Sequence, residues 1–205
     1  MVTYSFPDAT HAIVATGRWL DGKGWAPATS GNYSCRLDDG SFAVTVSGRH
    51  KGRLNEDDVM RVDGAGISLD GKRPSAETAL HLAIYAMFPD CGAVLHSHSP
   101  TAVALTRAYP ALAGWEFAGH EMLKALPGVT THDTAVTLPI VDNSQDMAMI
   151  WDAVSPMLGA MSAYLIRSHG LYGWGADMAE AERVIEAVEW LIMAELAEAQ
   201  FRSKS

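Results

Sequence analysis

The chain has 205 residues, of which 48% are hydrophobic and 19% are charged, and this composition supplies a packed core and excludes a disordered or fibrous protein. Its formal net charge is −9, which argues against a binder of nucleic acid or of anionic membranes, because such proteins present basic surfaces. The length fits one domain over residues 1–205, and we find no internal repeat, low-complexity tract or linker.

Targeting and redox features are sparse. No run of about 18 apolar residues is present, so no membrane span is predicted. The opening MVTYSFPDAT lacks a charged segment followed by an apolar run, which a signal peptide requires. Cys35 and Cys91 are too few for a disulfide framework. We therefore expect a cytoplasmic protein.

The N-terminal half alternates helices with short strands. Asp8 is expected to cap a first helix that ends at Gly22. Residues 28–48 predict a β-hairpin around the turn pair Asp39-Gly40. Asn55 is expected to cap a short turn, and Ser75 to open a helix that runs to about Met87. Further short strands are predicted at 59–62 and 66–69.

The C-terminal half continues this alternation. Strands are predicted at 93–98, 134–141, 163–170 and 170–174, and helices are expected to begin at Ser99-Pro100, at Asn143 or Ser144, and at Asp177. Several strands are joined by tight turns rather than by helical crossovers. A mixed or mostly antiparallel sheet covered by helices is therefore favoured over a Rossmann fold.

Three histidines end apolar strands. His96 and His98 lie two residues apart on one strand, so both imidazoles point to the same face and could reach one metal ion. The alternative is two strand-end histidines that bond locally, since a chain with eight histidines can produce such a pair by chance. With His169, which ends a second strand, they predict a three-imidazole site with an open fourth position, as in catalytic zinc sites. We read the other five as structural or solvated: His11, His50, His81, His120 and His132.

Two loops carry the groups of an anion site. Hydroxyls, an amide and glycine-freed backbone N–H groups recur in Thr29-Ser30-Gly31-Asn32 and in Ser47-Gly48, while Lys51 adds a positive charge. Ser75 would contribute donors at a helix N-terminus. The alternative is a pair of ordinary loops at the ends of a hairpin.

Two carboxylates are candidates for acid–base chemistry. Glu77 lies near the start of a predicted helix, where an acid is also common for capping. Glu121 lies in a segment of mixed polarity, where it would otherwise belong to a solvated helix face. Either could serve as a general acid or base beside a metal-bound substrate. We read Cys35 and Cys91 as buried apolar residues rather than nucleophiles.

The ordered set of motifs resembles one family over about residues 8–200. The motifs are Thr29-x-Gly31-Asn32, Val46-Ser47-Gly48, Pro74-Ser75-Ala76-Glu77, His96-Ser97-His98 and His169-Gly170. Together they resemble the class II (zinc-dependent) aldolase family. This resemblance implies an α/β fold, a three-layer αβα domain with a central, largely antiparallel sheet. It also implies one Zn²⁺ per subunit, a sugar-phosphate substrate and a homotetramer.

Within the family, the opening helix and four stretches look most like the methylthioribulose-1-phosphate dehydratase branch: Ser47–Gly52, Pro74–Thr78, Glu121-Met122-x-Lys124 and His169–Gly175. The resemblance places the metal on His96, His98 and His169, and the substrate phosphate near Thr29, Asn32, Ser47, Gly48 and Ser75. It puts Glu77 where the aldolases have their acid/base glutamate and Glu121 where the dehydratases have theirs. The chain departs from many aldolases at Ala76, which replaces a second hydroxyl residue, and Lys51 is a candidate to compensate in the phosphate site.

The activity implied by this resemblance is a hydro-lyase reaction of methionine salvage. It would convert 5-methylthioribulose 1-phosphate to 5-methylthio-2,3-dioxopentyl phosphate and water. The alternatives are aldol cleavage or epimerisation at C4, which family members carry out with the same metal. A non-catalytic binding module on the same fold is the remaining alternative.

Overall fold

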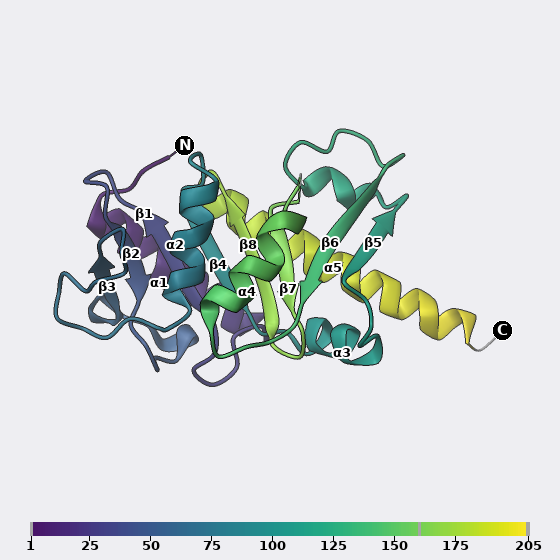
Figure 1. Cartoon of the computed structure of the whole chain (residues 1–205), viewed down its shortest axis with the longest axis horizontal. Coiled ribbons are helices and arrows are strands. Elements are labelled where there is room, and N and C mark those ends of the chain that lie inside the picture. Colours follow the sequence, from purple (N-terminus) through teal and green to yellow (C-terminus); the bar gives the residue numbers. More distant parts are fainter. Residues whose placement is uncertain (1, 160, 204–205) are drawn as a thin grey trace.

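Eight strands form one sheet within the described residues, 2–159 and 161–203 of a computed structural model (Figure 1). The strand order is β3-β2-β1-β4-β8-β7-β6-β5. The strands are β1 (Asn32–Arg36), β2 (Phe42–Thr45), β3 (Val59–Val62), β4 (Ala93–Ser97), β5 (Gly114–Ala118), β6 (Ala135–Val141), β7 (Ala163–Ile166) and β8 (Gly170–Gly175). Neighbouring strands run antiparallel except β6 and β7, which are parallel.

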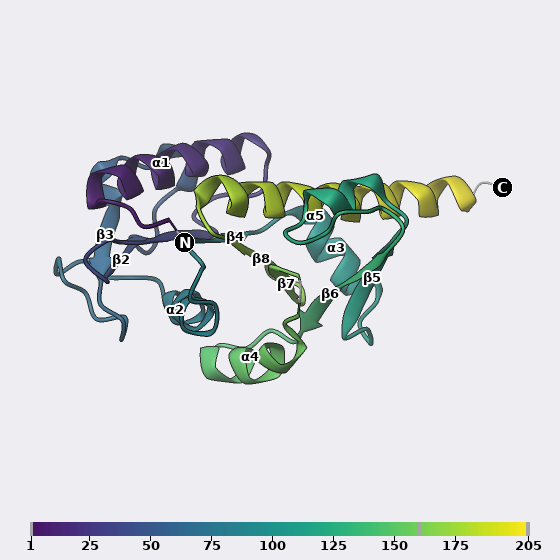
Figure 2. The same ribbon diagram turned by 90° about the horizontal axis from the view of Figure 1, so that it is seen from above.

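Helices cover both faces of this sheet (Figure 2). One face carries α1 (Phe6–Gly22), α3 (Pro100–Ala108) and α5 (Met178–Arg202), and the other carries α2 (Thr78–Met87) and α4 (Met147–Val154). Short 3₁₀ turns complete the chain: η1 (Lys51–Arg53), η2 (Glu56–Asp58), η3 (Glu121–Ala125) and η4 (Ser155–Met157). The predicted three-layer αβα arrangement with a largely antiparallel sheet is confirmed.

Alternation along the central strands builds two apolar cores. In β4, Leu95 packs into the core beneath α1, α3 and α5, whereas Val94 packs into the core beneath α2 and α4. In β7, Leu165 packs into the first of these cores and Tyr164 into the second. This period of two follows from the pleat of a strand that is covered on both faces.

The N-terminal capping residues of two helices agree with the sequence prediction, and that of a third helix differs. Ser99 caps α3 by accepting from the N–H of Ala102, and Asp177 caps α5 by accepting from the N–H of Glu180. The first helix is capped by Ser5, whose side chain accepts from the N–H of Asp8, so the predicted cap at Asp8 was wrong by one turn.

None of the described helices could span a membrane: α5 is long enough, with 25 residues, but is too polar.

Two predictions about helix starts were also wrong. The helix expected from Ser75 begins at Thr78, because Ser75 and the two residues after it form a separate turn. In that turn the hydroxyl of Ser75 accepts from the N–H of Glu77. The cap of α4 is Asp146 rather than Asn143 or Ser144. Short polar side chains close to one another compete for this role, so the sequence alone does not identify the cap.

Two strand predictions also changed. The strand expected at 66–69 is reduced to one bridge between Val62 and Ser68, since the carboxylate of Asp63 accepts from the N–H groups of Ala65 and Ile67 and turns the backbone. Strand β5, with the short sequence GWEFA, was not predicted. Its only sheet neighbour among the described strands is β6, so the long-range pairing decides its conformation.

The pairing places the predicted histidines at one edge of the sheet. Strand β4 ends there at Ser97, and the turn from β7 to β8 lies beside it. Because β6 is parallel to β7 and β5 is antiparallel to β6, the connection 119–134 between β5 and β6 lies at the opposite edge. Figure 1 shows this connection at the far end of the β5–β6 hairpin from α3, the helix that begins just after His98.

Candidate active site

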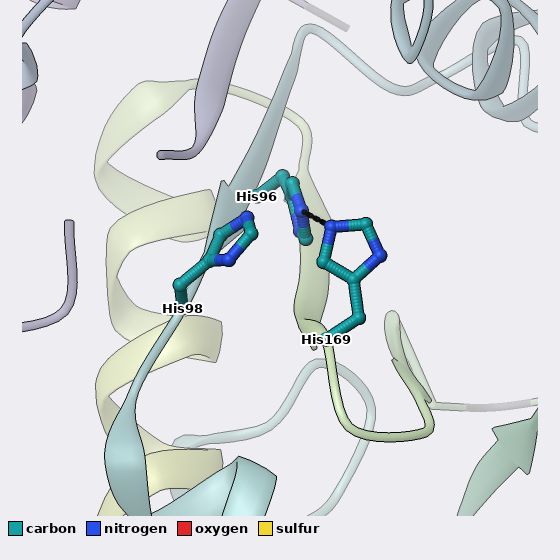
Figure 3. A group of neighbouring side chains, drawn as sticks. All are labelled: His96, His98 and His169. Carbon is teal, nitrogen blue, oxygen red and sulfur yellow. Dashed lines mark hydrogen bonds between the residues drawn. The ribbon is translucent and has the colours of Figure 1, made fainter. Parts of the chain in front are cut away.

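His96, His98 and His169 converge at the sheet edge (Figure 3). One ligand nitrogen from each lies within 4.8 Å of the other two. His96 belongs to β4, His98 follows that strand, and His169 lies in the turn between β7 and β8. The Nε2 atoms of His96 and His169 are 3.3 Å apart. The structure thus brings together the three histidines that the sequence predicted as metal ligands.

Tight backbone contacts make this convergence possible. Ser168, directly before His169, has a positive φ of 58°, a conformation that costs free energy for a residue with a side chain. At Gly170 a Cβ atom would lie 2.1 Å from the carbonyl oxygen of Ser97 and 3.0 Å from the ring of His96. Only glycine therefore allows the turn to approach β4 this closely.

The ring of His96 is held in a defined orientation. Its Nδ1 lies 3.0 Å from the carbonyl oxygen of Leu171, and because a carbonyl only accepts, Nδ1 donates to it. The ring also stacks on Tyr172, with centroids 4.1 Å apart and an interplanar angle of 16°. Both contacts orient Nε2 toward the other two histidines.

Glu77 closes the cluster from the α2 side. Its Oε1 lies 3.0 Å from Nε2 of His169 and 3.5 Å from Nε2 of His96, and its Oε2 accepts from Nδ2 of Asn32 at 2.7 Å. Burial opposes ionisation of this carboxyl, but attraction to His96 and hydrogen bonds with both imidazoles outweigh it and hold the pKa of Glu77 well below its usual range. The carboxylate is thus directed at the point where the imidazole nitrogens meet.

These donors fit a divalent transition metal. Burial, and then the neighbouring imidazoles of His96 and His169, lower the pKa of His98 to about 3, so this ring is neutral and able to coordinate. Its buried Nε2 has no hydrogen-bond partner among the described residues, and such an atom costs about 1–3 kcal/mol. A cation between the three rings would remove that cost. Three imidazole nitrogens with a nearby carboxylate oxygen are typical of zinc sites.

A pocket of about 270 Å³ adjoins the histidines. The bridge between Val46 and Pro74 brings the loop after β2 beside the turn that precedes α2. The residues that line it are Thr29, Ser30, Gly31, Asn32, Thr45, Val46, Ser47, Gly48, Lys51, Ser75, Glu77 and His98. All six residues predicted for anion binding therefore face one space, together with Glu77 and one candidate metal ligand. The arrangement can hold an anionic group and a metal-bound group of one small molecule at the same time.

Lys51 supplies the positive charge of this pocket. The residue is only 2% exposed, and its Nζ donates to the carbonyl oxygens of Thr29 and Arg49 at 3.0 and 2.7 Å. Burial lowers the pKa of Lys51 to about 8, although Glu77 and Asp58 act in the opposite direction. An anion bound beside this ammonium group would gain a charge-assisted contact.

Glu121 is the one predicted site residue that the structure leaves apart from the others. It begins η3, its side chain is 71% exposed, and it does not line the pocket. It pairs with Lys124 at 2.7 Å and with His132 at 3.4 Å. Since η3 belongs to the connection at the opposite edge of the sheet, Glu121 cannot reach the histidines of its own chain in this structure.

Two residues of the site were not identified from the sequence. Thr45 lines the pocket, and Tyr172 supports His96. Thr45 lies two residues before Ser47 along the same extended segment, so strand periodicity could have indicated it. The role of Tyr172 depends on the register that places it opposite His96, which no local pattern reveals.

Comparisons with known proteins identify relatives along nearly the whole chain. The family described as Class II Aldolase and Adducin N-terminal domain matches residues 11–196. The methylthioribulose-1-phosphate dehydratase of Pseudomonas paraeruginosa (strain DSM 24068 / PA7) is 51% identical over 193 residues, which are 91% of this chain and 93% of the relative. The protein of the same name from Methylococcus capsulatus (strain ATCC 33009 / NCIMB 11132 / Bath) is 48% identical over 182 residues, 87% of this chain and 88% of the relative.

Solved structures show the same fold at lower identity. YgbL from Klebsiella pneumoniae superposes with a TM-score of 0.81 and 24% identity, and the match covers 95% of this chain and 91% of that one. The L-fuculose-1-phosphate aldolase of Thermus thermophilus gives a TM-score of 0.75 at 24% identity, with 95% and 96% covered. At these identities the likeness concerns the architecture only.

Proposed function

The chain belongs to the class II aldolase and adducin family, and from this premise we propose that it catalyses the dehydration of 5-methylthioribulose 1-phosphate to 5-methylthio-2,3-dioxopentyl phosphate. Relatives about half identical over most of the chain carry the name of that dehydratase. The observation that carries the proposal is the pocket itself, which joins an anion-binding set to the histidine cluster. A phosphorylated ketose needs both.

The substrate would lie across this pocket with its phosphate at one end. The residues that carry hydroxyl, amide, backbone N–H and ammonium donors all line that space: Thr29, Asn32, Ser47, Gly48, Lys51 and Ser75. The phosphate would accept hydrogen bonds from these groups, and the ketose oxygens would then point toward the histidines. Fixing the phosphate in this way orients the reacting carbons.

The reaction removes the proton from C3, releases the C4 hydroxyl as water and returns a proton to C4 as the enol becomes a ketone. Bound at His96, His98 and His169, one Zn²⁺ per subunit supplies a Lewis acid for the negative charge that develops on the substrate oxygens. We propose Glu121 as the principal group that moves these protons and Glu77 as the second. A positioned acid or base contributes about 10²- to 10⁴-fold.

Glu121 can serve this role only from another copy of the chain. It lies on the outer surface at the sheet edge opposite the histidines, so the site of its own subunit is out of reach. We therefore propose a homotetramer in which η3 of one subunit approaches the pocket of a neighbour. In such an assembly the exposed carboxylate becomes part of a complete site.

The biological setting follows from the proposed reaction. It belongs to methionine salvage, and we propose that it takes place in the cytoplasm. Both cysteines are free and buried, which supports a reducing compartment. We also propose that residues 1–205 form one class II aldolase-like domain, since every described strand joins one sheet.

Product analysis tests the proposed reaction against the other chemistries of the family. The zinc-loaded protein is incubated with 5-methylthioribulose 1-phosphate, and the products are separated by mass and by carbonyl content. We expect a diketone phosphate lighter than the substrate by one water. Two smaller fragments, one of them an aldehyde, would indicate an aldolase, and an isomer of unchanged mass would indicate an epimerase. Either result would overturn the proposal.

Lys51 gives a pH-dependent prediction for phosphate binding. Its ammonium group is charged below its pKa of about 8 and neutral above it, and the ionisable groups that act on it are Glu77, Asp58 and His98. We expect the KM of the wild type to rise as pH passes upward through about 8. In Lys51→Met the KM should rise roughly 10- to 100-fold at neutral pH, because a hydrogen bond to a charged group contributes about 1.5–3 kcal/mol, and its pH dependence near 8 should vanish.

Lys72→Met is the matched control for this prediction. Nζ of Lys72 also donates to two backbone carbonyls, those of Asp57 and Val59, but Lys72 lies outside the pocket. Its removal should leave the KM for the sugar phosphate unchanged. Identical KM profiles against pH in wild type and Lys51→Met would exclude Lys51 from the phosphate site.

A further inference from the structure

Glu189 is a buried carboxyl in the apolar face of a helix. It belongs to α5 and is 0% exposed, and its helical neighbours Ile185, Val188 and Ile192 all pack into the core. Removing a carboxyl group from water is costly unless hydrogen bonds replace the lost hydration. The residue therefore has a role that an apolar side chain at the same place would not fill.

The partners of Glu189 lie at the start of α3. Its Oε2 accepts from the hydroxyls of Ser99 at 2.6 Å and Thr101 at 3.1 Å. Ser99 is also the N-cap of α3, and its Oγ accepts from the N–H of Ala102 at 3.0 Å. Burial raises the pKa of Glu189 to about 7, although the hydrogen bonds from Ser99 and Thr101 act in the opposite direction. In its ionised form the carboxylate only accepts, so it directs the single hydroxyl proton of Ser99 to itself and leaves the lone pairs of that oxygen for the cap.

Ser99 is the residue directly after His98, and these two residues form the turn that joins β4 to α3. The backbone of this turn places the imidazole of His98 in the histidine cluster. The N–H of His98 donates to the carbonyl oxygen of Trp25 at 2.7 Å, which fixes the backbone on one side. The link from Glu189 to Ser99 fixes it on the other side. The carboxylate also lies at the N-terminus of α3, where the helix dipole favours negative charge.

The orientation of the His98 ring depends on its backbone more than the orientation of the His96 ring does. His96 is oriented by the carbonyl of Leu171 and by stacking on Tyr172. By contrast, Nε2 of His98 has no hydrogen-bond partner among the described residues, and its ring packs against the other two imidazoles with centroids 4.5 and 4.7 Å away. The place of this ring is thus determined largely by the turn that Glu189 holds.

We propose that Glu189 is a positioning residue for the metal site, which fixes Ser99 and the start of α3 and so holds His98 where it can share a cation with His96 and His169. This inference rests on the three-histidine metal site of the proposed function. Glu189 itself touches neither substrate nor metal; it acts through the turn. A group that orients a metal ligand in this way typically changes metal affinity about 10- to 100-fold when it is lost.

Metal binding by the substrate-free protein tests the proposal with Glu189→Leu and Glu189→Gln. Leucine suits the apolar face but cannot accept from Ser99, whereas glutamine keeps an acceptor oxygen at the same place. We expect Glu189→Leu to bind Zn²⁺ at least about 10-fold more weakly in competition with a chromophoric chelator, and its Co²⁺-loaded form to show a shifted visible absorption band. Glu189→Gln should restore both properties to near wild type.

Glu186→Gln is the matched control on the same helix, since Glu186 is exposed and pairs with Lys23. It should leave Zn²⁺ affinity and the Co²⁺ spectrum unchanged. If Glu189→Leu does not fold, Ser99→Ala replaces it, with Ser5→Ala, which removes the cap of α1, as its control. Ser99→Ala should weaken Zn²⁺ binding and Ser5→Ala should not.

The outcomes separate this inference from the proposed function. Wild-type Zn²⁺ affinity and an unchanged Co²⁺ spectrum in Glu189→Leu, or in Ser99→Ala if that variant is used, would overturn the positioning role while the metal site stands. Equal losses in Glu189→Leu and Glu189→Gln would also overturn it, because the acceptor oxygen would then be irrelevant. A wild-type protein that binds neither Zn²⁺ nor Co²⁺ would instead remove the metal site on which both proposals depend.

Discussion

Replacing His96 with alanine is expected to remove the bound metal and to lower turnover of the sugar phosphate by at least about 1,000-fold. The variant loses the imidazole nitrogen that Leu171 and Tyr172 orient toward the cluster. A metal ion acting as a Lewis acid contributes several kcal/mol to the transition state, and about 4 kcal/mol corresponds to that factor. Metal content after dialysis and kcat/KM measure the two effects.

His11→Ala serves as the control for this substitution. His11 lies on α1, pairs with Glu56 and has a side chain that is 70% exposed, so it lies outside the cluster. This variant should keep full metal content and activity. Full zinc occupancy in a folded His96→Ala protein would contradict the assignment of the three-histidine site, whatever the activity of that variant.

Glu121→Gln is expected to lower kcat at least about 100-fold while the metal content stays unchanged. The amide keeps the size of the side chain but cannot exchange a proton with the substrate. Because Glu121 is not one of the proposed metal ligands, its replacement by a side chain of the same size should leave the three histidines in place. Glu198→Gln, at another glutamate that pairs with a basic residue of its own helix, should leave kcat unchanged.

Mixed assemblies test whether Glu121 acts on a neighbouring subunit. His96→Ala chains supply an intact Glu121, and Glu121→Gln chains supply intact histidines. When the two inactive variants are unfolded and refolded together, we expect activity to return, because some pockets then combine both intact parts. A mixture no more active than its separate components would contradict the shared site. Near wild-type turnover in Glu121→Gln alone would remove this residue from the mechanism.

Much of the architecture could be predicted because its determinants are local. The strand that carries His96 and the strand that precedes His169 are short apolar runs, and each is followed by residues that end a strand. Ser99 and Asp177 are capping residues directly before helices, and both cap as predicted. Strand β5 and the segment 66–69 were misjudged because pairing with a distant strand, or a side chain turning the backbone, decides their structure.

The candidate site divides in the same way. Hydroxyl, glycine and histidine residues at the ends of elements indicated the pocket, since loops at one sheet edge meet in space. The stacking of Tyr172 on His96 and the hydrogen bond from Asn32 to Glu77 depend on strand register and helix placement, which short motifs do not encode. Glu189 did leave a signal in the sequence, an acid within an apolar helical stripe. Its partner on α3 could be found only in the folded chain.

The most direct test of the account compares the zinc-loaded wild type with His96→Ala on 5-methylthioribulose 1-phosphate, with the product mass followed over time. The account predicts that the wild type converts the substrate to a diketone phosphate lighter by one water molecule, and that the variant leaves the substrate intact. Equal dehydration by both proteins, or a wild-type product of any other mass, would contradict a dehydratase that works at the three histidines.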